Sequence, residues 1–215
     1  MNFAVSYSGG KDCMLALYRM IVRGHTPTAL ITTVNAQQDR SWFHGIQIEL
    51  LNAVSDSLGI PLIACECTPD GYAQAHGEGL VKARAMGADA CVFGDIDIEG
   101  HKTWNEERCA DIGLECVLPL WGEDREALVR ETIDAGFKAL IKIVQSDKLD
   151  GSFLGQTLSL PMLEEFKAAG IDACGENGEY HTFVYDGPVF KYPVPFKMGK
   201  IVEFENHKAI NILPD

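Results

Sequence analysis

Ser6-Tyr7-Ser8-Gly9-Gly10-Lys11-Asp12-Cys13 is the stretch that decides the fold of this chain. An apolar run at 3–5 precedes it and predicts a buried strand, and apolar residues spaced along 14–22 predict a helix. A loop that contains two glycines therefore joins a strand end to a helix start. The unpaired N–H groups and the dipole at a helix start attract anions, and glycine lets an anion approach the backbone closely. The sequence thus predicts a phosphate-binding loop.

This loop differs from the Walker A loop, which has a glycine five residues before Gly-Lys and a serine or threonine after the lysine. Val5 and Asp12 occupy those two positions. A carboxylate beside a phosphate must hold Mg²⁺, cap the helix or turn away. We predict that Asp12 is a Mg²⁺ ligand, with helix capping as the alternative. The predicted phosphate-binding residues are Ser8, Gly9, Gly10, Lys11, Asp12 and Cys13.

Composition limits the class of protein. The chain has 215 residues, enough for one large or two small domains, and no apolar run reaches the roughly 18 residues of a membrane span. The net charge of −13, without a cluster of basic residues, argues against an extended nucleic-acid surface. Seven cysteines, an odd number with no Cys-x-x-Cys pair, indicate reduced thiols. We therefore expect a cytoplasmic protein with no membrane partner.

Strands and helices alternate in the first half. Strands are predicted at 3–5, 28–34, 61–65, 88–93 and 115–118, and helices at 13–23, 44–58, 72–86 and 103–112. This alternation predicts an α/β fold with a doubly wound parallel sheet, in which ligands bind beyond the carboxyl ends of the strands. Thr33, Gly94 and Asp95 lie at such ends. We expect them to join the loop in one ligand-binding crevice.

The second half has a different pattern. Helices are predicted at 123–135 and 160–169, and short strands at 139–144, 181–185 and 199–204. This pattern predicts a smaller α+β unit. We therefore expect two domains, 1–122 and 123–215, that share a cleft.

Gly175-Glu176-Asn177-Gly178-Glu179-Tyr180-His181-Thr182 is the second stretch that is dense in chemical groups. Its carboxylates could hold Mg²⁺, orient an amine or act as a base. The alternative is a polar turn that ends in a strand, with both acids in solvent. Residue types alone favour the second interpretation, the polar turn.

The two stretches together resemble a known family. Ser-Gly-Gly-Lys-Asp resembles the PP-loop of the ATP pyrophosphatase superfamily, with Cys13 in place of a final serine. A thiol is the weaker hydrogen-bond donor, although a helix start should lower its pKa. Residues 175–182 resemble the Glu-Gly-Gly-Glu-Tyr-Glu-Thr signature of the diphthine–ammonia ligase family, with Asn177 for a glycine and His181 for a glutamate. The likeness extends over nearly the whole chain.

The resemblance implies an ATP-dependent ligase with ATP and Mg²⁺ as cofactors. A carboxylate is adenylated, pyrophosphate leaves, and ammonia displaces AMP to form an amide. In the family this carboxylate belongs to diphthine, a modified histidine of a translation elongation factor. The catalytic residues that we predict are Lys11, Glu176, Glu179 and Tyr180.

Two alternatives keep the same loop. One is an enzyme that transfers sulfur or an amine to RNA or to a small metabolite. The other is a module that senses ATP without catalysis. Cytoplasmic enzymes of this size often form symmetric dimers, so a homodimer is compatible with the sequence.

Overall fold

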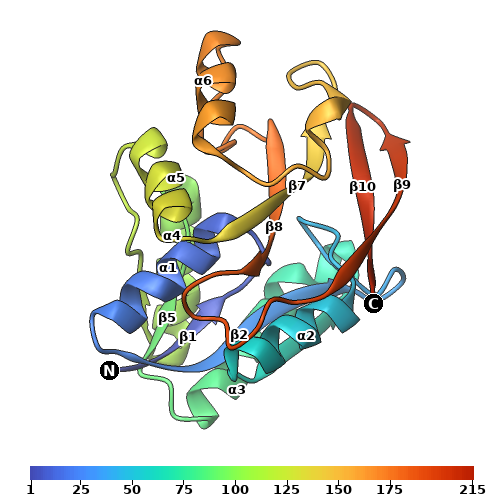
Figure 1. Ribbon diagram of the computed structural model, residues 1–215. Coiled ribbons are helices and arrows are strands. Elements are labelled where there is room, and N and C mark those ends of the chain that lie inside the picture. The colour runs from blue at the N-terminus through green and yellow to red at the C-terminus, as the bar shows by residue number, and fades with distance from the viewer.

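Two β-sheets form the protein, and the computed structural model describes residues 1–215. Strands up to residue 117 form a mostly parallel sheet, and strands from residue 138 onward form a four-stranded antiparallel sheet. Figure 1 shows the second sheet above the first, with helices between and around them. None of the helices combines the length and the apolar character needed to cross a membrane.

The parallel sheet has the order β4-β2-β1-β5-β6. These strands are β1 (Asn2–Ser6), β2 (Thr26–Asn35), β4 (Leu62–Cys67), β5 (Ala90–Val92) and β6 (Glu115–Val117), and the short β3 (Arg40–Ser41) pairs antiparallel with the end of β2. From the central β1 the chain first moves outward to β2 and β4 and then crosses to the other side for β5. Strand order therefore reverses beside β1. In such sheets the ligand crevice opens at this reversal, beyond the carboxyl ends of the strands.

Helices cover both faces of the parallel sheet, which confirms the predicted doubly wound α/β fold. The helices α1 (Lys11–Val22) and α2 (Ile48–Leu58) lie between the two sheets, in contact with β8 and β10 respectively. On the opposite face, α3 (Tyr72–Ala85) contacts β2 and β4, and α4 (Glu99–Ile112) contacts β6.

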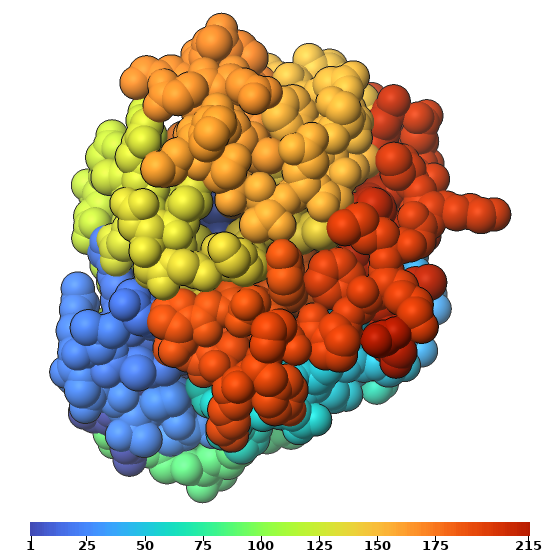
Figure 2. Space-filling model, viewed as in Figure 1, coloured from blue at the N-terminus to red at the C-terminus, as the bar shows by residue number.

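The antiparallel sheet confirms the smaller α+β unit. Its order is β8-β7-β10-β9. The strands are β7 (Lys138–Gln145), β8 (Tyr180–Asp186), β9 (Phe196–Phe204) and β10 (His207–Pro214), accompanied by α5 (Arg125–Asp134) and α6 (Leu160–Ala168); two single-turn 3₁₀ helices lie at Pro69–Gly71 and Gly151–Phe153. Figure 2 shows this C-terminal half, in yellow to red, seated on the N-terminal half in blue and green.

One apolar core joins the two halves. A cluster of 40 buried side chains includes Val5 of β1, Leu15 of α1, Ile141 of β7 and Phe183 of β8. A separate cluster of 14 lies under α3 and α4. Because the larger cluster crosses residue 122, the division into domains at that point stays a prediction.

Several element boundaries differ from the sequence prediction, two of them at the starts of helices, and strands β3 and β10 were not predicted. The second helix begins at Ile48 and not at residue 44, because Gly45 has a φ of +58° and interrupts it. The fourth helix begins at Glu99 and not at 103, with Gly100 in its first turn, where the glycine obscured the helical pattern. Strand β10 was missed because its register shifts between Ile210 and Ile212, so the alternation with period two is broken.

Gly94 offers a test of how the crevice is built. A Cβ at Gly94 would lie 2.6 Å from the Cys13 nitrogen and 2.7 Å from the Asp12 carbonyl carbon, both backbone atoms. We expect Gly94→Ala to lower the free energy of unfolding by about 1–3 kcal/mol, because the start of α1 must shift. Urea unfolding followed by circular dichroism measures this change.

Gly77→Ala is the matched control. Gly77 lies inside α3, and a Cβ there would meet nothing within 4 Å. We expect this variant to be more stable by about 1 kcal/mol, since alanine is the better helix former. Equal stability of the two variants would show that the close approach at Gly94 is unimportant.

Candidate active site

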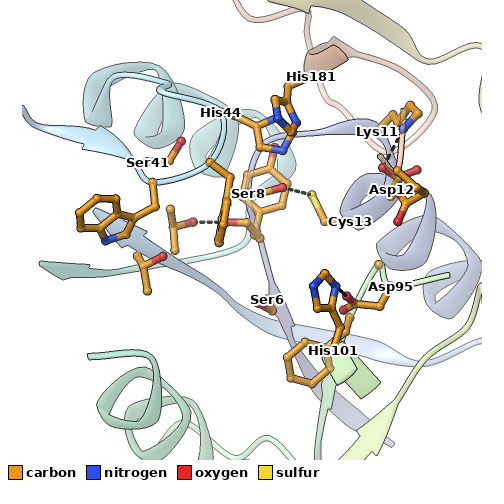
Figure 3. Close-up of a pocket in the computed structure, with 18 of the residues that line it drawn as sticks. Ser6, Ser8, Lys11, Asp12, Cys13, Ser41, His44, Asp95, His101 and His181 are labelled. Carbon is orange, nitrogen blue, oxygen red and sulfur yellow. Dashed lines mark hydrogen bonds and ion pairs between the residues drawn. The ribbon is translucent and has the colours of Figure 1, made fainter. Parts of the chain in front are cut away.

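A cavity of about 470 Å³ opens at the carboxyl ends of β1, β2 and β5, and residues of the 174–182 segment form another of its walls. Of the residues predicted from the sequence, Ser8, Lys11, Asp12, Cys13, Asp95, Glu176 and Tyr180 line it, and so do Thr33 and Gly94. Figure 3 shows His44 and His181 on one side, Lys11 and Asp12 on another, and Asp95 with His101 on a third. The structure thus brings both motif stretches to one cavity.

The loop after β1 requires both of its glycines. Gly9 has a φ of +90°, which favours glycine, and a Cβ on Gly10 would lie 2.4 Å from Cε1 of His44. Two of the loop N–H groups are engaged inside the protein: Lys11 N donates to Thr182 Oγ1 at 3.0 Å, and Gly10 N donates to Ser8 Oγ at 3.4 Å. Gly9 and Gly10 do not line the cavity. Phosphate binding by these two residues therefore stays a prediction.

Lys11 is almost fully buried, at 3% exposure. Its Nζ donates to Asp12 Oδ2 at 2.8 Å and to the Cys174 carbonyl at 2.5 Å, and lies 5.3 Å from the centre of the Tyr180 ring. Burial disfavours the ammonium, but Asp12 and then Tyr180 outweigh burial and hold the pKa of Lys11 well above its usual value. Lys11 therefore presents a full positive charge at the cavity wall.

Three carboxylates line the cavity, those of Asp12, Asp95 and Glu176. Burial, and then repulsion by Asp12, raises the pKa of Glu176 to about 7. His101 Nδ1 lies 3.1 Å from Asp95 Oδ1, and Asn105 Nδ2 donates to Asp95 Oδ2 at 2.8 Å. No group of three His, Cys, Asp or Glu side chains is arranged to hold a metal ion.

Glu179 has a different environment from Glu176. It is 6% exposed, does not line the cavity, and accepts hydrogen bonds from Asn177 N at 3.1 Å and Asn177 Nδ2 at 3.2 Å. Tyr180 does line the cavity, and its hydroxyl donates to the Ala173 carbonyl. The Glu179 carboxylate thus closes the turn that carries Glu176. A direct chemical role for Glu179 stays a prediction.

The environment of Cys13 corrects one expectation. Its thiol donates to the Gly10 carbonyl at 3.1 Å and lies 3.5 Å from Ser8 Oγ. Burial raises the pKa of this thiol, although a helix start was expected to lower it. The cause is that the side chain is buried, which outweighs the hydrogen bonds from Ser8 and Gly9. Cys13 therefore fills the position of a serine as a neutral thiol.

Family models match both halves of the chain. The model of the diphthamide synthase N-terminal domain matches residues 1–116, and that of the diphthamide synthase C-terminal domain matches residues 124–212. This chain belongs to the diphthamide synthase family. The expectation of an ATP-dependent ligase is thereby confirmed at the level of the family.

Curated relatives support this assignment along most of the chain. The diphthine–ammonia ligase of Danio rerio is 28% identical over 208 residues, covering 86% of this chain and 82% of the relative. The diphthine–ammonia ligase of Homo sapiens is 26% identical over 228 residues, covering 94% and 85%. A solved structure, the predicted subunit of a tRNA methyltransferase from Methanocaldococcus jannaschii, is 16% identical with a TM-score of 0.46 and covers 86% of this chain and 96% of that chain.

Several residues that line or adjoin the site of this diphthamide synthase family protein were not predicted from the sequence. His76 on α3 and Asn105 on α4 line the cavity, and Asn105 is one of the two side chains that hold Asp95. Lys142 is 2% exposed and lies beside a register shift in β7. The sequence gives one weak indication of His76: it follows Tyr72 by four residues, so both side chains lie on the same face of the predicted helix. For Lys142, the apolar residues on either side are the only indication in the sequence that it is buried.

Lys142 lies among positive and neutral groups. It makes no ion pair and no side-chain hydrogen bond, and Arg40, His44 and His181 are near it. Burial, and then repulsion by Arg40, lowers the pKa of Lys142 to about 8. The rings of His44 and His181 lie 4.9 Å apart, and burial lowers the pKa of both, that of His181 to about 4. Both imidazoles are therefore neutral at pH 7.

We predict that the buried Lys142 lowers the free energy of unfolding of this protein, and that the effect depends on pH. The pKa of Lys142 falls from its usual value of 10.5 to about 8 in the folded protein. This difference corresponds to about 3 kcal/mol of stability lost by burying the charged form. This cost is complete below pH 8, falls as the pH rises from 8 to 10.5, and is absent above that. We expect Lys142→Met to raise the free energy of unfolding by about 1–3 kcal/mol at pH 7.

Denaturation in urea at pH 7, 9 and 10.5 checks this expectation, with the advantage of the variant shrinking at each step. Lys148→Met replaces an exposed lysine six residues later and should change stability by less than about 0.5 kcal/mol. A difference between the Lys142 variant and the parent chain that does not depend on pH would contradict the assigned pKa.

Proposed function

We propose that this chain activates a carboxylate with ATP, releasing pyrophosphate, and then transfers ammonia to the adenylated carboxyl carbon to form an amide. The observation that carries the proposal is the placement of a charged, buried Lys11 beside Glu176 in a cavity at the strand-order reversal. The name of the curated relatives makes diphthine the first acceptor to test.

The phosphates of ATP would lie against Ser8, Lys11, Asp12 and Cys13. Charge develops on the departing pyrophosphate, and a fixed ammonium in a buried site stabilises that charge strongly. Lys11 is held by Asp12 and the Cys174 carbonyl, so it would exchange one of these bonds for a phosphate oxygen. Thr33 and Gly94 line the same cavity and would border the nucleoside.

The acidic side chains fit a magnesium ion that also binds phosphate. Mg²⁺ keeps most of its waters and takes one or two carboxylates plus substrate phosphates, so it needs no cage made of protein alone. Burial, and then repulsion by Asp12, raises the pKa of Glu176, and a divalent cation between these two acids would offset both effects. Asp12 and Glu176 would hold the ion, which would neutralise phosphate charge.

Ammonia must be unprotonated to attack and must lose a proton afterwards. Once Mg²⁺ has left with the pyrophosphate, Glu176, with a pKa of about 7, can attract ammonium when ionised and accept a proton. His181, neutral at pH 7, lies on the same cavity. We assign Glu179 and Tyr180 to positioning, because the carboxylate holds Asn177 and the hydroxyl holds Ala173.

We propose that the chain works in the cytoplasm. All seven cysteines are free and six are buried, which suits a reducing compartment. We also propose that two copies of the chain form a symmetric homodimer, as cytoplasmic enzymes of this size often do.

The test supplies ATP, Mg²⁺, ammonium and an elongation factor that carries diphthine. We expect AMP and pyrophosphate in equal amounts and an acceptor in which an amino group replaces a hydroxyl, seen by mass spectrometry. Lys11→Met should lower the rate by at least about 100-fold, because it removes the charge that stabilises the leaving pyrophosphate. Release of ADP and phosphate in place of AMP would refute the proposal.

The rate of AMP formation should depend on the ionisation of Glu176. At low Mg²⁺ we expect the rate to rise through a pKa of about 7, because only the ionised carboxylate binds cations. Higher Mg²⁺ should move this midpoint to lower pH. Glu176→Gln should remove the ionisation and slow the reaction.

Glu179→Gln is the control for this profile. It loosens the same turn, but Glu179 does not line the cavity, so the midpoint should stay in place. A midpoint that moves equally in both variants would assign the titration to the turn as a whole.

A further inference from the structure

The cavity has a part lined by aromatic rings, next to the charged part described above. We call it the aromatic lobe, and it consists of Trp42, Phe43, Tyr72, His76, Phe93 and Trp104. Flat apolar walls of this kind suit a flat ring system. The charged part does not explain why these rings gather on the same cavity.

His76 is the polar residue of the aromatic lobe. It is 2% exposed, with its ring centre 5.2 Å from that of Trp104 and 6.1 Å from that of Phe93. The Tyr72 ring lies nearly parallel to it, at 14° and 6.3 Å. His76 Nε2 is 3.2 Å from Ser6 Oγ, which fixes the ring, whereas Nδ1 is buried and has no hydrogen-bond partner.

His76 lines the cavity, and its unpaired Nδ1 is a buried atom. A buried nitrogen without a partner is costly, and a ligand that enters the aromatic lobe and reaches Nδ1 with a matching edge removes the cost. Burial lowers the pKa of His76 to about 4, so the ring is neutral and one nitrogen carries a proton. If Ser6 donates to Nε2, Nδ1 is the donor; if Nε2 donates to Ser6, Nδ1 is the acceptor. Adenine can satisfy either form, because its edge has an amino group and ring nitrogens.

We propose that the aromatic lobe holds the base of ATP and that His76 recognises the hydrogen-bonding edge of adenine through Nδ1. This inference rests on the proposed function, since it needs ATP in the cavity. It adds the residue that selects the base. Ser6 is the positioning residue, because it acts through the His76 ring.

The test compares two ligands on one variant. Calorimetry measures the affinity of the whole chain for ATP and for inorganic pyrophosphate, both with Mg²⁺ and without ammonium. His76→Phe keeps the size and the aromatic packing of the ring but removes both nitrogens. We expect the Kd for ATP to rise about tenfold and the Kd for pyrophosphate to change by less than about twofold.

ATP analogues identify the contact itself. One analogue lacks the 6-amino group and the others each replace one ring nitrogen by carbon. At least one should bind the parent chain about tenfold more weakly than ATP, and His76→Phe should remove that difference. Ser6→Ala should shift the Kd for ATP in the same direction as His76→Phe, by a smaller factor.

The outcomes separate the two proposals. If the parent chain binds neither ATP nor pyrophosphate, the proposed function fails. If it binds both and His76→Phe leaves the ATP affinity unchanged, the assignment of His76 is overturned. An equal loss for both ligands, or discrimination among the analogues that survives in the variant, also overturns it, because His76 would then act only through packing.

Discussion

The docking of β8 onto the loop after β1 is the constraint on which the site depends. Val184 N donates to the Gly9 carbonyl at 3.0 Å, and Lys11 N donates to Thr182 Oγ1 at 3.0 Å. His44 Nδ1 lies 2.7 Å from the Thr182 carbonyl, so it carries the proton of that ring. These bonds join residues more than 130 positions apart in the sequence. Without them the loop would be a bare turn, and the acidic segment would have no fixed position relative to it.

A second set of bonds orients the acidic segment. Arg125 contacts Asp97 at 2.6 Å, just beyond β5, and Asp172 at 2.5 Å, before the turn that carries Glu176. Asp172 accepts in turn from the backbone N–H groups of Cys174 and Glu176. The Arg125 guanidinium therefore links the N-terminal half of the chain to the segment that carries Glu176. Its planar, forked geometry suits this link better than an ammonium would.

The sequence was sufficient for features whose cause is local. The glycines of the loop, the alternation of strands and helices, and the turn at 175–179 each follow from backbone chemistry, and the structure has all of them. Features that depend on distant segments could not be predicted. Glu176 and Glu179 are three residues apart and chemically alike, yet one faces the cavity and the other accepts two hydrogen bonds from Asn177. Which of the two carboxylates reaches the cavity depends on how the turn is oriented against the rest of the protein, and the fold sets that orientation.

His76 and Lys142 show the same limit for buried polar groups. In the sequence each is one polar residue among apolar neighbours, and such residues are usually paired when buried. Here His76 Nδ1 has no partner, and Lys142 has no acidic neighbour within ion-pair distance. Both weaken the fold, and both lie at or beside the cavity.

The cavity itself combines groups that oppose one another in the absence of ligands. Burial, and then repulsion by Asp12, raises the pKa of Glu176 on one wall, whereas burial, and then nearby imidazole and positive groups, lowers the pKa values of His44 and His181 on another. A ligand that carries phosphates together with a divalent cation supplies the missing charge to both walls at once. Binding then relieves repulsion that the folded chain already contains. A cavity with only positive groups would attract the phosphates of such a ligand but repel its cation, and a cavity with only carboxylates would do the reverse.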